Sequence, residues 1–189
     1  MNEIAFQNRL TTYNLYNKVN KSQMRGMLAI IDYWESNKLF TDARWLAYIL
    51  ATVYHETGKS FEAIEEVGQG IRKPYGRKIK QNLRPYQLPD KLYYGRGLVQ
   101  LTWYDNYDKF GKLLKIDLLN KPELALKLDV SIEILVKGMT QGLFKGVNLS
   151  RYFNDQREDY VSARKVINGT DKADLIALYA KKFLNCILM

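Results

Sequence analysis

The chain has 189 residues, a length that fits one domain better than two. Hydrophobic residues make up 47% of the chain, which supports a sizeable core and excludes wholesale disorder. Its 29 lysines and arginines outnumber its 20 aspartates and glutamates. The resulting net charge of +9 favours a polyanionic partner, either nucleic acid, an anionic membrane or an anionic cell-wall polymer; the alternative is that the charge serves solubility alone.

The chain has a single cysteine, Cys186, and a single histidine, His55, which limits the disulfides and metal sites that it can form. No disulfide can form within the chain, and a zinc site of the usual kind cannot be assembled. The start of the chain, MNEIAFQNRLTTYNLYNK, lacks the apolar stretch of a signal peptide, and no apolar run approaches the ~18 residues of a membrane span. We therefore expect a protein made in the cytoplasm, with no cofactor, no metal and no stable membrane insertion.

The spacing of apolar residues predicts two helices in the first third of the chain. Ser22 can cap the first, whose apolar side carries Met24, Met27, Leu28, Ile31 and Trp34. Thr41 and Asp42 can start the second, whose apolar residues are Trp45, Leu46, Ile49, Leu50 and Val53. Gly58 can end this second helix.

Residues 67–97 are rich in glycine, proline and basic side chains, which predicts an irregular segment of functional importance. Helical spacing returns over residues 104–114, over 129–139 with Asp129 as a cap, over 158–167, and over 171–183 with Asp171 as a cap. The fold class is therefore mostly α, a single helical domain over residues 1–189 with at most a small β element in the basic segment.

The stretch ATVYHETGKSFEAIEE, residues 51–66, raises the question of paired catalytic carboxyls. Glycoside hydrolysis needs one carboxylic acid, best held in apolar surroundings, and one carboxylate across the sugar chain. Glu56 ends an apolar helix and fits the acid. Glu62, Glu65 and Glu66 follow Gly58, where a break in the helix lets the chain aim a second carboxylate back across a cleft. The alternative is that Glu56 is an ordinary solvated charge at a helix end.

A second group of polar residues lies in YYGRGLVQLTWYDNY, residues 93–107. Two glycines around Arg96 allow a tight turn. The amides and hydroxyl of Gln100, Thr102 and Asn106 suit sugar hydroxyls or a water, and tyrosine rings can stack on pyranose faces. The alternative is a loop followed by an ordinary amphipathic helix. The segment lacks the spacing and the Lys-Ser/Thr pair of a phosphate-binding loop.

Together these motifs resemble glycoside hydrolase family 19, which comprises plant-type chitinases and shorter phage and prophage endolysins. The resemblance is carried by HETG, EAIEEVG and YYGRGLVQLTWYDNY in this order, and by KPELALKLDVSIEILVKGM and ARKVINGTD further on. It extends from about residue 24 to the end of the chain. It implies a mostly α, lysozyme-like fold with a deep cleft that hydrolyses β-1,4 links in N-acetylhexosamine polymers with inversion.

Carried over residue by residue, the resemblance implies Glu56 as general acid, Glu66 as general base and Thr102 as the hydroxyl that orients the attacking water. Glu65 is the second candidate for the base. His55 is expected to pack beside the site rather than to shuttle a proton. The candidate substrate-binding residues are His55, Glu65, Tyr94, Arg96, Gln100, Asn106, Tyr107 and Asn168.

The sequence departs from the plant chitinases in ways that favour the endolysin branch. It lacks their disulfide cysteines, and the insert between Glu66 and Gly95 is shorter and more basic. Peptidoglycan carries free carboxylates whereas chitin is neutral, so a basic cleft region favours peptidoglycan. The basic residues concerned are Arg72, Lys73, Arg77, Lys78, Lys80 and Arg84.

These observations predict a monomeric peptidoglycan muramidase of phage or prophage origin that cuts between N-acetylmuramic acid and N-acetylglucosamine. We expect it in the host bacterial cytoplasm, from which it reaches the wall after membrane permeabilisation; a virion-borne enzyme acting at entry is the alternative. Three other functions stay open: a small bacterial chitinase, a catalytically inactive wall-binding module, and a nucleic-acid-binding protein. Charge alone suggests the last of these, and no nucleic-acid-binding motif supports it.

Overall fold

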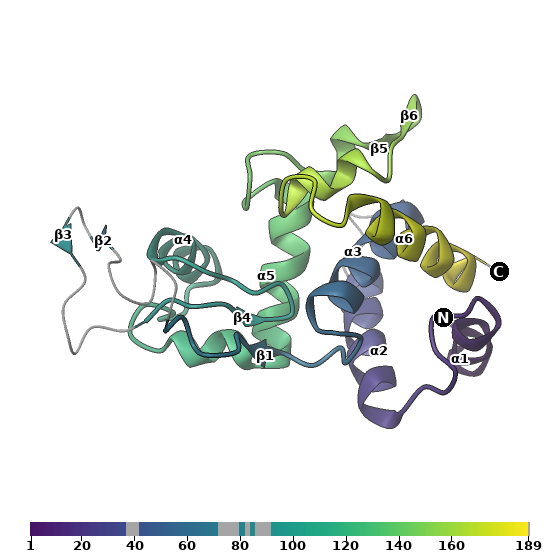
Figure 1. Ribbon diagram of the computed structural model, residues 1–189, viewed down its shortest axis with the longest axis horizontal. Coiled ribbons are helices and arrows are strands. Elements are labelled where there is room, and N and C mark those ends of the chain that lie inside the picture. The colour runs from purple at the N-terminus through teal and green to yellow at the C-terminus, as the bar shows by residue number, and fades with distance from the viewer. Residues whose placement is uncertain (37–41, 72–79, 82–83, 86–91, 189) are drawn as a thin grey trace. The chain divides into compact units, whose positions relative to one another are not determined.

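The computed structural model describes residues 1–36, 42–71, 80–81, 84–85 and 92–188 (Figure 1). Contacts divide the chain into two compact units, the first formed by Met1–Phe61 and Leu135–Met189 and the second by Glu62–Ile134. Helices dominate both units, and strands occur only as two-residue pieces in the described part of the chain. The predicted fold class, mostly α with little β structure, is confirmed.

The first unit is built around helix α3, which packs along helix α6 (Figure 1). Every residue of α3 from Leu46 to Tyr54 is buried. The Tyr54 ring meets the rings of Tyr179 and Phe183 edge-on, with centroids 4.7 and 5.6 Å apart. The elements of this unit are α1 (Glu3–Thr12), α2 (Lys21–Ser36), α3 (Ala43–Glu56), the second part of α5 (Leu128–Gln141), η3 (Leu149–Arg151), β5 (Phe153–Asn154), β6 (Arg157–Glu158), η4 (Ser162–Val166) and α6 (Ala173–Ile187).

The caps at the starts of α2 and α3 were predicted with different success. Asp42 caps α3 as predicted, because its side chain accepts a hydrogen bond from the Arg44 backbone nitrogen. For α2 the predicted cap at Ser22 was wrong by two residues. The Asn20 side chain accepts from the Gln23 backbone nitrogen at 2.8 Å, and the Gln23 side chain accepts from the Asn20 backbone nitrogen at 2.9 Å. This reciprocal pair is a capping box.

Three predictions in the second half of the chain need correction. Helix α5 begins at Leu128, so Asp129 lies within its first turn rather than capping it. Helix α6 follows Lys172, and no side chain caps it, so Asp171 does not start it. The helix predicted over residues 158–167 is reduced to one 3-10 turn, Ser162–Val166, after strand β6.

Gly26 lets helix α2 approach the backbone of Phe61 within the first unit. A Cβ at position 26 would lie 2.2 Å from the Phe61 carbonyl oxygen and 2.7 Å from its Cβ. Phe61 is 1% exposed, and its backbone nitrogen donates to the Thr57 hydroxyl at 3.0 Å. Moving Phe61 aside would therefore cost packing and a hydrogen bond. This contact places the chain that leaves α3.

Gly26→Ala is therefore expected to destabilise the fold by about 1–3 kcal/mol, the usual cost of overpacking. Helix propensity alone predicts the opposite, a gain of about 1 kcal/mol. Urea unfolding followed by circular dichroism measures the difference. A more stable Gly26→Ala variant would contradict the close approach.

The second unit is organised by a short antiparallel ladder between β1 (Ile64–Glu65) and β4 (Arg96–Gly97). In this ladder Glu65 pairs with Arg96, and the Leu98 backbone nitrogen donates to the Ser131 hydroxyl at 2.7 Å. The remaining elements are β2 (Lys80–Gln81), β3 (Arg84–Pro85), α4 (Tyr104–Leu114), η2 (Pro122–Leu126) and the first part of α5. Helix α4 has the bounds that the sequence predicts.

The basic segment is only partly described. Arg72, Lys73, Arg77 and Lys78 lie outside the described residues, and Lys80 and Arg84 belong to the β2–β3 ladder. The small β element predicted there is present. Within the described ranges, no helix combines the length and the apolar character needed to cross a membrane.

Candidate active site

Helix α3 ends in a way that fixes Glu56 in its last turn. The Lys59 backbone nitrogen donates to the Tyr54 carbonyl at 2.8 Å, and the Gly58 nitrogen donates to the His55 carbonyl at 3.2 Å. Gly58 has a φ of 56°, so the pattern is a Schellman motif with glycine in the left-handed position. The predicted stop at Gly58 is confirmed, and it leaves Glu56 as the last helical residue.

The Glu56 carboxylate is held by a buried arginine of the same unit. Arg164 Nη2 lies 2.8 Å from Glu56 Oε1, and the two side chains are 2% and 19% exposed. Arg164 Nε donates to the Asp171 carbonyl at 3.0 Å, which fixes the guanidinium. Glu56 is therefore not an ordinary solvated charge at a helix end. Arg164 was missed at the sequence level, although it lies within the ARKVINGTD motif.

Glu65 carries a second carboxylate that has its own set of donors. The Tyr94 hydroxyl donates to Oε1 at 2.7 Å, Gln69 Nε2 donates to Oε2 at 3.1 Å, and Arg96 Nε lies 3.6 Å from Oε1. The Tyr94 hydrogen bond is the largest cause of a lowered pKa at Glu65, with Gln69 and Arg96 adding to it against the opposing effect of burial. The side chain is 38% exposed. Glu65 is thus an ionised and accessible carboxylate.

Arg96 and Tyr107 form the buried support of this group. The Arg96 guanidinium lies 3.6 Å from the centroid of the Tyr94 ring, and its Nη1 donates to the Tyr107 hydroxyl at 3.0 Å. Tyr107 has no exposed surface and donates to the Tyr94 carbonyl at 2.9 Å; burial raises its pKa to about 12. Both residues were predicted to be substrate-binding. Their burial corrects this prediction, because Arg96 and Tyr107 hold Tyr94 and Glu65 instead.

Glu66 makes a different connection. Its backbone nitrogen donates to the Gly95 carbonyl at 2.8 Å, and its Oε2 accepts from the Gly95 nitrogen at 3.1 Å. Successive residues of an extended segment point to opposite sides, so the carboxylates of Glu65 and Glu66 diverge. Glu66 is half-buried, and its carboxylate folds onto the backbone of the neighbouring segment.

The loop before α4 holds the three predicted polar residues. The Thr102 hydroxyl donates to the Gln100 carbonyl at 2.7 Å, and Asn106 Nδ2 donates to the Thr102 carbonyl at 2.8 Å. Gln100 Nε2 donates to the carbonyls of Ile64 and Gly97 at 3.1 and 3.2 Å. All three side chains are half-buried. The second unit therefore connects Thr102, Gln100 and Asn106 to the ladder that carries Glu65.

The remaining predicted residues, His55 and Asn168, belong to the first unit. His55 is half-buried and precedes Glu56 in α3. Asn168 is exposed, and its backbone nitrogen donates to the Arg164 carbonyl at 2.9 Å. Within the described ranges, no group of three or more His, Cys, Asp or Glu residues is arranged to hold a metal ion.

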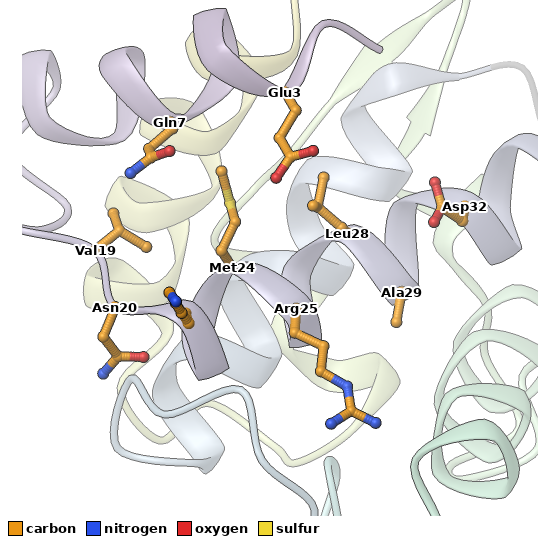
Figure 2. Close-up of a pocket in the computed structure, with 10 residues that line it drawn as sticks. Glu3, Gln7, Val19, Asn20, Met24, Arg25, Leu28, Ala29 and Asp32 are labelled. Atoms are coloured by element: carbon orange, nitrogen blue, oxygen red, sulfur yellow. The ribbon is translucent and has the colours of Figure 1, made fainter.

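None of these residues lines a cavity of about 510 Å³ that lies between α1 and α2 of the first unit (Figure 2). Figure 2 shows Glu3 and Gln7 of α1 facing Met24 and Leu28 of α2. The charged residues that line this cavity carry both signs: Lys21 and Arg25 are basic, whereas Glu3 and Asp32 are acidic. The cavity therefore favours neither anionic nor cationic ligands. The full lining is Glu3, Gln7, Val19, Asn20, Lys21, Met24, Arg25, Leu28, Ala29 and Asp32.

Comparison with known proteins finds a matching family model and relatives in sequence, and a shared fold among solved structures. The family model described as chitinase class I, glycoside hydrolase family 19, matches residues 43–137. Basic endochitinase CHB4 of Brassica napus is 42% identical over 83 residues, which are 43% of this chain and 29% of that protein. Inactive chitinase-like protein 1 of Hevea brasiliensis is 56% identical over 37 residues, which are 20% of this chain and 12% of that protein.

Chitinase C from Streptomyces griseus HUT6037 shares the fold with a TM-score of 0.64 at 22% identity, over 98% of this chain and 91% of that one. The plant relatives named above are matched over less than a third of their own length. The family match begins at the first residue of α3 and includes Glu56, Glu65 and Thr102. Since it extends over half of the sequence, the chain belongs to glycoside hydrolase family 19, the chitinase class I family.

Proposed function

We propose that this protein hydrolyses the β-1,4 bond between N-acetylmuramic acid and N-acetylglucosamine in peptidoglycan, by an inverting acid–base mechanism. The observation that carries the hydrolytic part is the carboxylate of Glu65. It is accessible, and Tyr94, Gln69 and Arg96 keep it ionised, which a general base requires. Membership of family 19 supplies the reaction class.

Glu56 is assigned as the general acid that protonates the leaving glycosidic oxygen. A general acid begins the reaction with a proton, whereas the Arg164 guanidinium favours the charged carboxylate. Arg164 therefore orients the carboxyl through Oε1 and stabilises the carboxylate that remains after proton transfer, an interaction that is strongest late in the reaction. Oε2, which makes no hydrogen bond among the described residues, is the oxygen that would carry the proton.

Glu65 rather than Glu66 is assigned as the general base. The Glu66 carboxylate is engaged by the Gly95 backbone, whereas the donors around Glu65 belong to side chains that leave it accessible. Glu65 takes a proton from water, the water oxygen bonds to the anomeric carbon, and the bond to the leaving oxygen breaks as Glu56 gives up its proton. The Thr102 hydroxyl already donates to Gln100, so its oxygen can accept from this water and orient it. Inversion requires the two carboxyls to be about 6.5–9.5 Å apart.

The choice of peptidoglycan rests on charge. A net charge of +9 favours a glycan that carries peptide carboxylates over neutral chitin. The second candidate is chitin, because a relative 42% identical over 83 residues is named an endochitinase. The role that we infer for the peptidoglycan activity is bacterial lysis by a phage or prophage endolysin acting once the membrane is permeable.

Digestion of purified peptidoglycan and of chitin oligomers, side by side, tests the proposal. Mass spectrometry of the peptidoglycan products is expected to show muramic acid at the new reducing ends, and the first-formed anomer is expected to be α, as inversion requires. A glucosamine reducing end would replace muramidase with glucosaminidase. Hydrolysis of chitin alone would favour the chitinase candidate.

Lysis assays separate the remaining alternatives. Permeabilised bacteria are expected to lose turbidity, whereas intact cells treated from outside are expected to lose it more slowly. Binding to peptidoglycan without release of fragments would identify an inactive wall-binding module; one relative is itself named inactive. Steeply salt-dependent binding to DNA without hydrolysis would instead indicate a nucleic-acid-binding protein.

A further inference from the structure

Trp103 combines surface exposure with an unusual backbone conformation. The residue is 44% exposed, although tryptophan is on average among the most buried residue types. Its φ of 77° and ψ of 141° fall in a region that is otherwise reserved for glycine. An exposed tryptophan and a strained backbone thus occur at the same residue. Strained backbone of this kind is found most often at functional sites.

The strained conformation is held from both sides. The Trp103 backbone nitrogen donates to the Tyr93 carbonyl at 2.9 Å, and the Trp103 carbonyl accepts from the backbone nitrogens of Asn106 and Tyr107, each at 3.1 Å. The preceding carbonyl, that of Thr102, accepts from Asn106 Nδ2 at 2.8 Å. These bonds fix where the indole emerges relative to the Thr102 hydroxyl.

The conformation also decides which face the ring takes. Tyr107, Phe110 and Gly111 form the buried side of α4, and a helical residue at position 103 would continue that side. With its positive φ, Trp103 instead lies outside the helix, and 44% of its surface is exposed. It lies immediately after the hydroxyl assigned to the attacking water, and in the unit that carries Glu65.

We propose that the Trp103 indole is a stacking platform for an N-acetylhexosamine ring of the glycan, next to the water-orienting Thr102. A flat, partly exposed ring covers the apolar face of a pyranose, and a fixed backbone orients it without a further loss of entropy on binding. This inference rests on the proposed function, since it takes the ligand to be a glycan of that class. Trp103 is a substrate-binding residue in this assignment and takes no part in proton transfer.

Three substitutions separate the ring from the backbone. Trp103→Ala and Trp103→Gly both remove the ring and are expected to raise KM about tenfold with kcat within about threefold of wild type, since stacking acts on substrate and transition state alike. Trp103→Phe keeps an aromatic ring and is expected to stay within about threefold of the wild-type KM. Trp103→Gly also relieves the strained φ and should melt at a higher temperature than Trp103→Ala. Tyr13→Ala, which removes another exposed ring (37%), is the matched control and should leave KM unchanged.

Fluorescence gives a readout that needs no turnover. The other tryptophans are less exposed, Trp34 at 6% and Trp45 half-buried, so acrylamide quenches Trp103 preferentially. N-acetylglucosamine oligomers or disaccharide-peptide fragments are expected to protect the wild-type protein from quenching, and Trp103→Phe is expected to lose this protection. The platform would be overturned, while the proposed function stands, by two results together. Trp103→Gly would hydrolyse the glycan with an unchanged KM, and the oligomers would not protect the wild-type protein from quenching. Protection without hydrolysis would support the platform while the proposed function fails.

Discussion

Glu56→Gln is expected to lower kcat for glycan hydrolysis by about 10²–10⁴-fold, the usual contribution of a positioned general acid. The amide keeps the size of the side chain and an oxygen for Arg164, but it has no proton to give to the leaving oxygen. Binding of the glycan should change little, so KM is expected to stay within about threefold of wild type. Initial rates on peptidoglycan, or on chitin oligomers if these prove to be the substrate, measure the effect.

The loss of charge beside Arg164 is the main complication of this experiment. Arg164 is 2% exposed, so removing its partner carboxylate weakens the fold as well as the chemistry. Thermal unfolding should therefore be measured in parallel. Glu62→Gln makes the same chemical change at an exposed position and should keep full activity. A folded Glu56→Gln variant with more than a tenth of wild-type activity would remove Glu56 from the acid role.

A second variant separates orientation from charge. Glu56→Asp keeps the carboxyl but withdraws it by one methylene from both Arg164 and the leaving oxygen. Its activity is expected to fall at least tenfold, because a shift of about 1 Å is enough to misplace a catalytic group. Full activity in Glu56→Asp together with loss in Glu56→Gln would mean that a carboxyl is needed but that its exact position is not.

The position of Glu56 could be predicted because its signals are local. The apolar spacing of α3, the cap at Asp42 and the stop at Gly58 are all read from neighbouring residues, and each is present in the structure. The pairing with Arg164 could not be predicted in the same way. It joins two segments far apart in the sequence, and nothing near Arg164 in the chain indicates which carboxylate it meets.

The aromatic residues of the motif at residues 93–107 also show what residue spacing cannot predict. Tyr107 is predicted from the sequence to bind substrate, but the helical phase of α4 turns it into the core with Phe110. Trp103 lies four residues earlier and would share that side if the helix extended to it. Its positive φ places Trp103 outside the helix and away from that side. The spacing of residues in the sequence cannot predict a backbone conformation that is unusual for tryptophan. Helix caps failed for a related reason, since Asp129 and Asp171 are good capping residues whose helices start elsewhere.

Replacing Glu65 and Glu66 one at a time is expected to identify the general base. Glu65→Gln should lower kcat about 10²–10⁴-fold, because no group then accepts the proton of the attacking water. Glu66→Gln keeps an oxygen for the Gly95 nitrogen and should retain activity within about tenfold of wild type. Rates and unfolding midpoints of both variants decide between the two residues. Greater loss in Glu66→Gln, with both proteins folded, would restore Glu66 as the base.

Azide sharpens the same comparison. A general base is needed only to activate water, so an anionic nucleophile should restore turnover when the base is removed. Glu65→Ala with azide is expected to release a glycosyl azide: azide bonds to the anomeric carbon while Glu56 protonates the leaving oxygen. The azide product should have the configuration that inversion predicts. Glu66→Ala should give no such product, and a missing azide product in Glu65→Ala would indicate a structural role for Glu65.

The acid limb of the pH profile tests how Glu65 is held ionised. The Tyr94 hydrogen bond is the largest cause of the lowered pKa of Glu65, so the acid limb of wild-type kcat/KM should lie at lower pH than an ordinary glutamate would give. Tyr94→Phe removes this bond and raises the pKa of Glu65, which moves the acid limb to higher pH. A structural defect would lower activity at all pH values, whereas loss of the Tyr94 hydroxyl from the base moves the limb and spares activity near neutral pH. Because Arg96 stacks on the ring that phenylalanine retains, the shift isolates the hydroxyl from the packing beneath it.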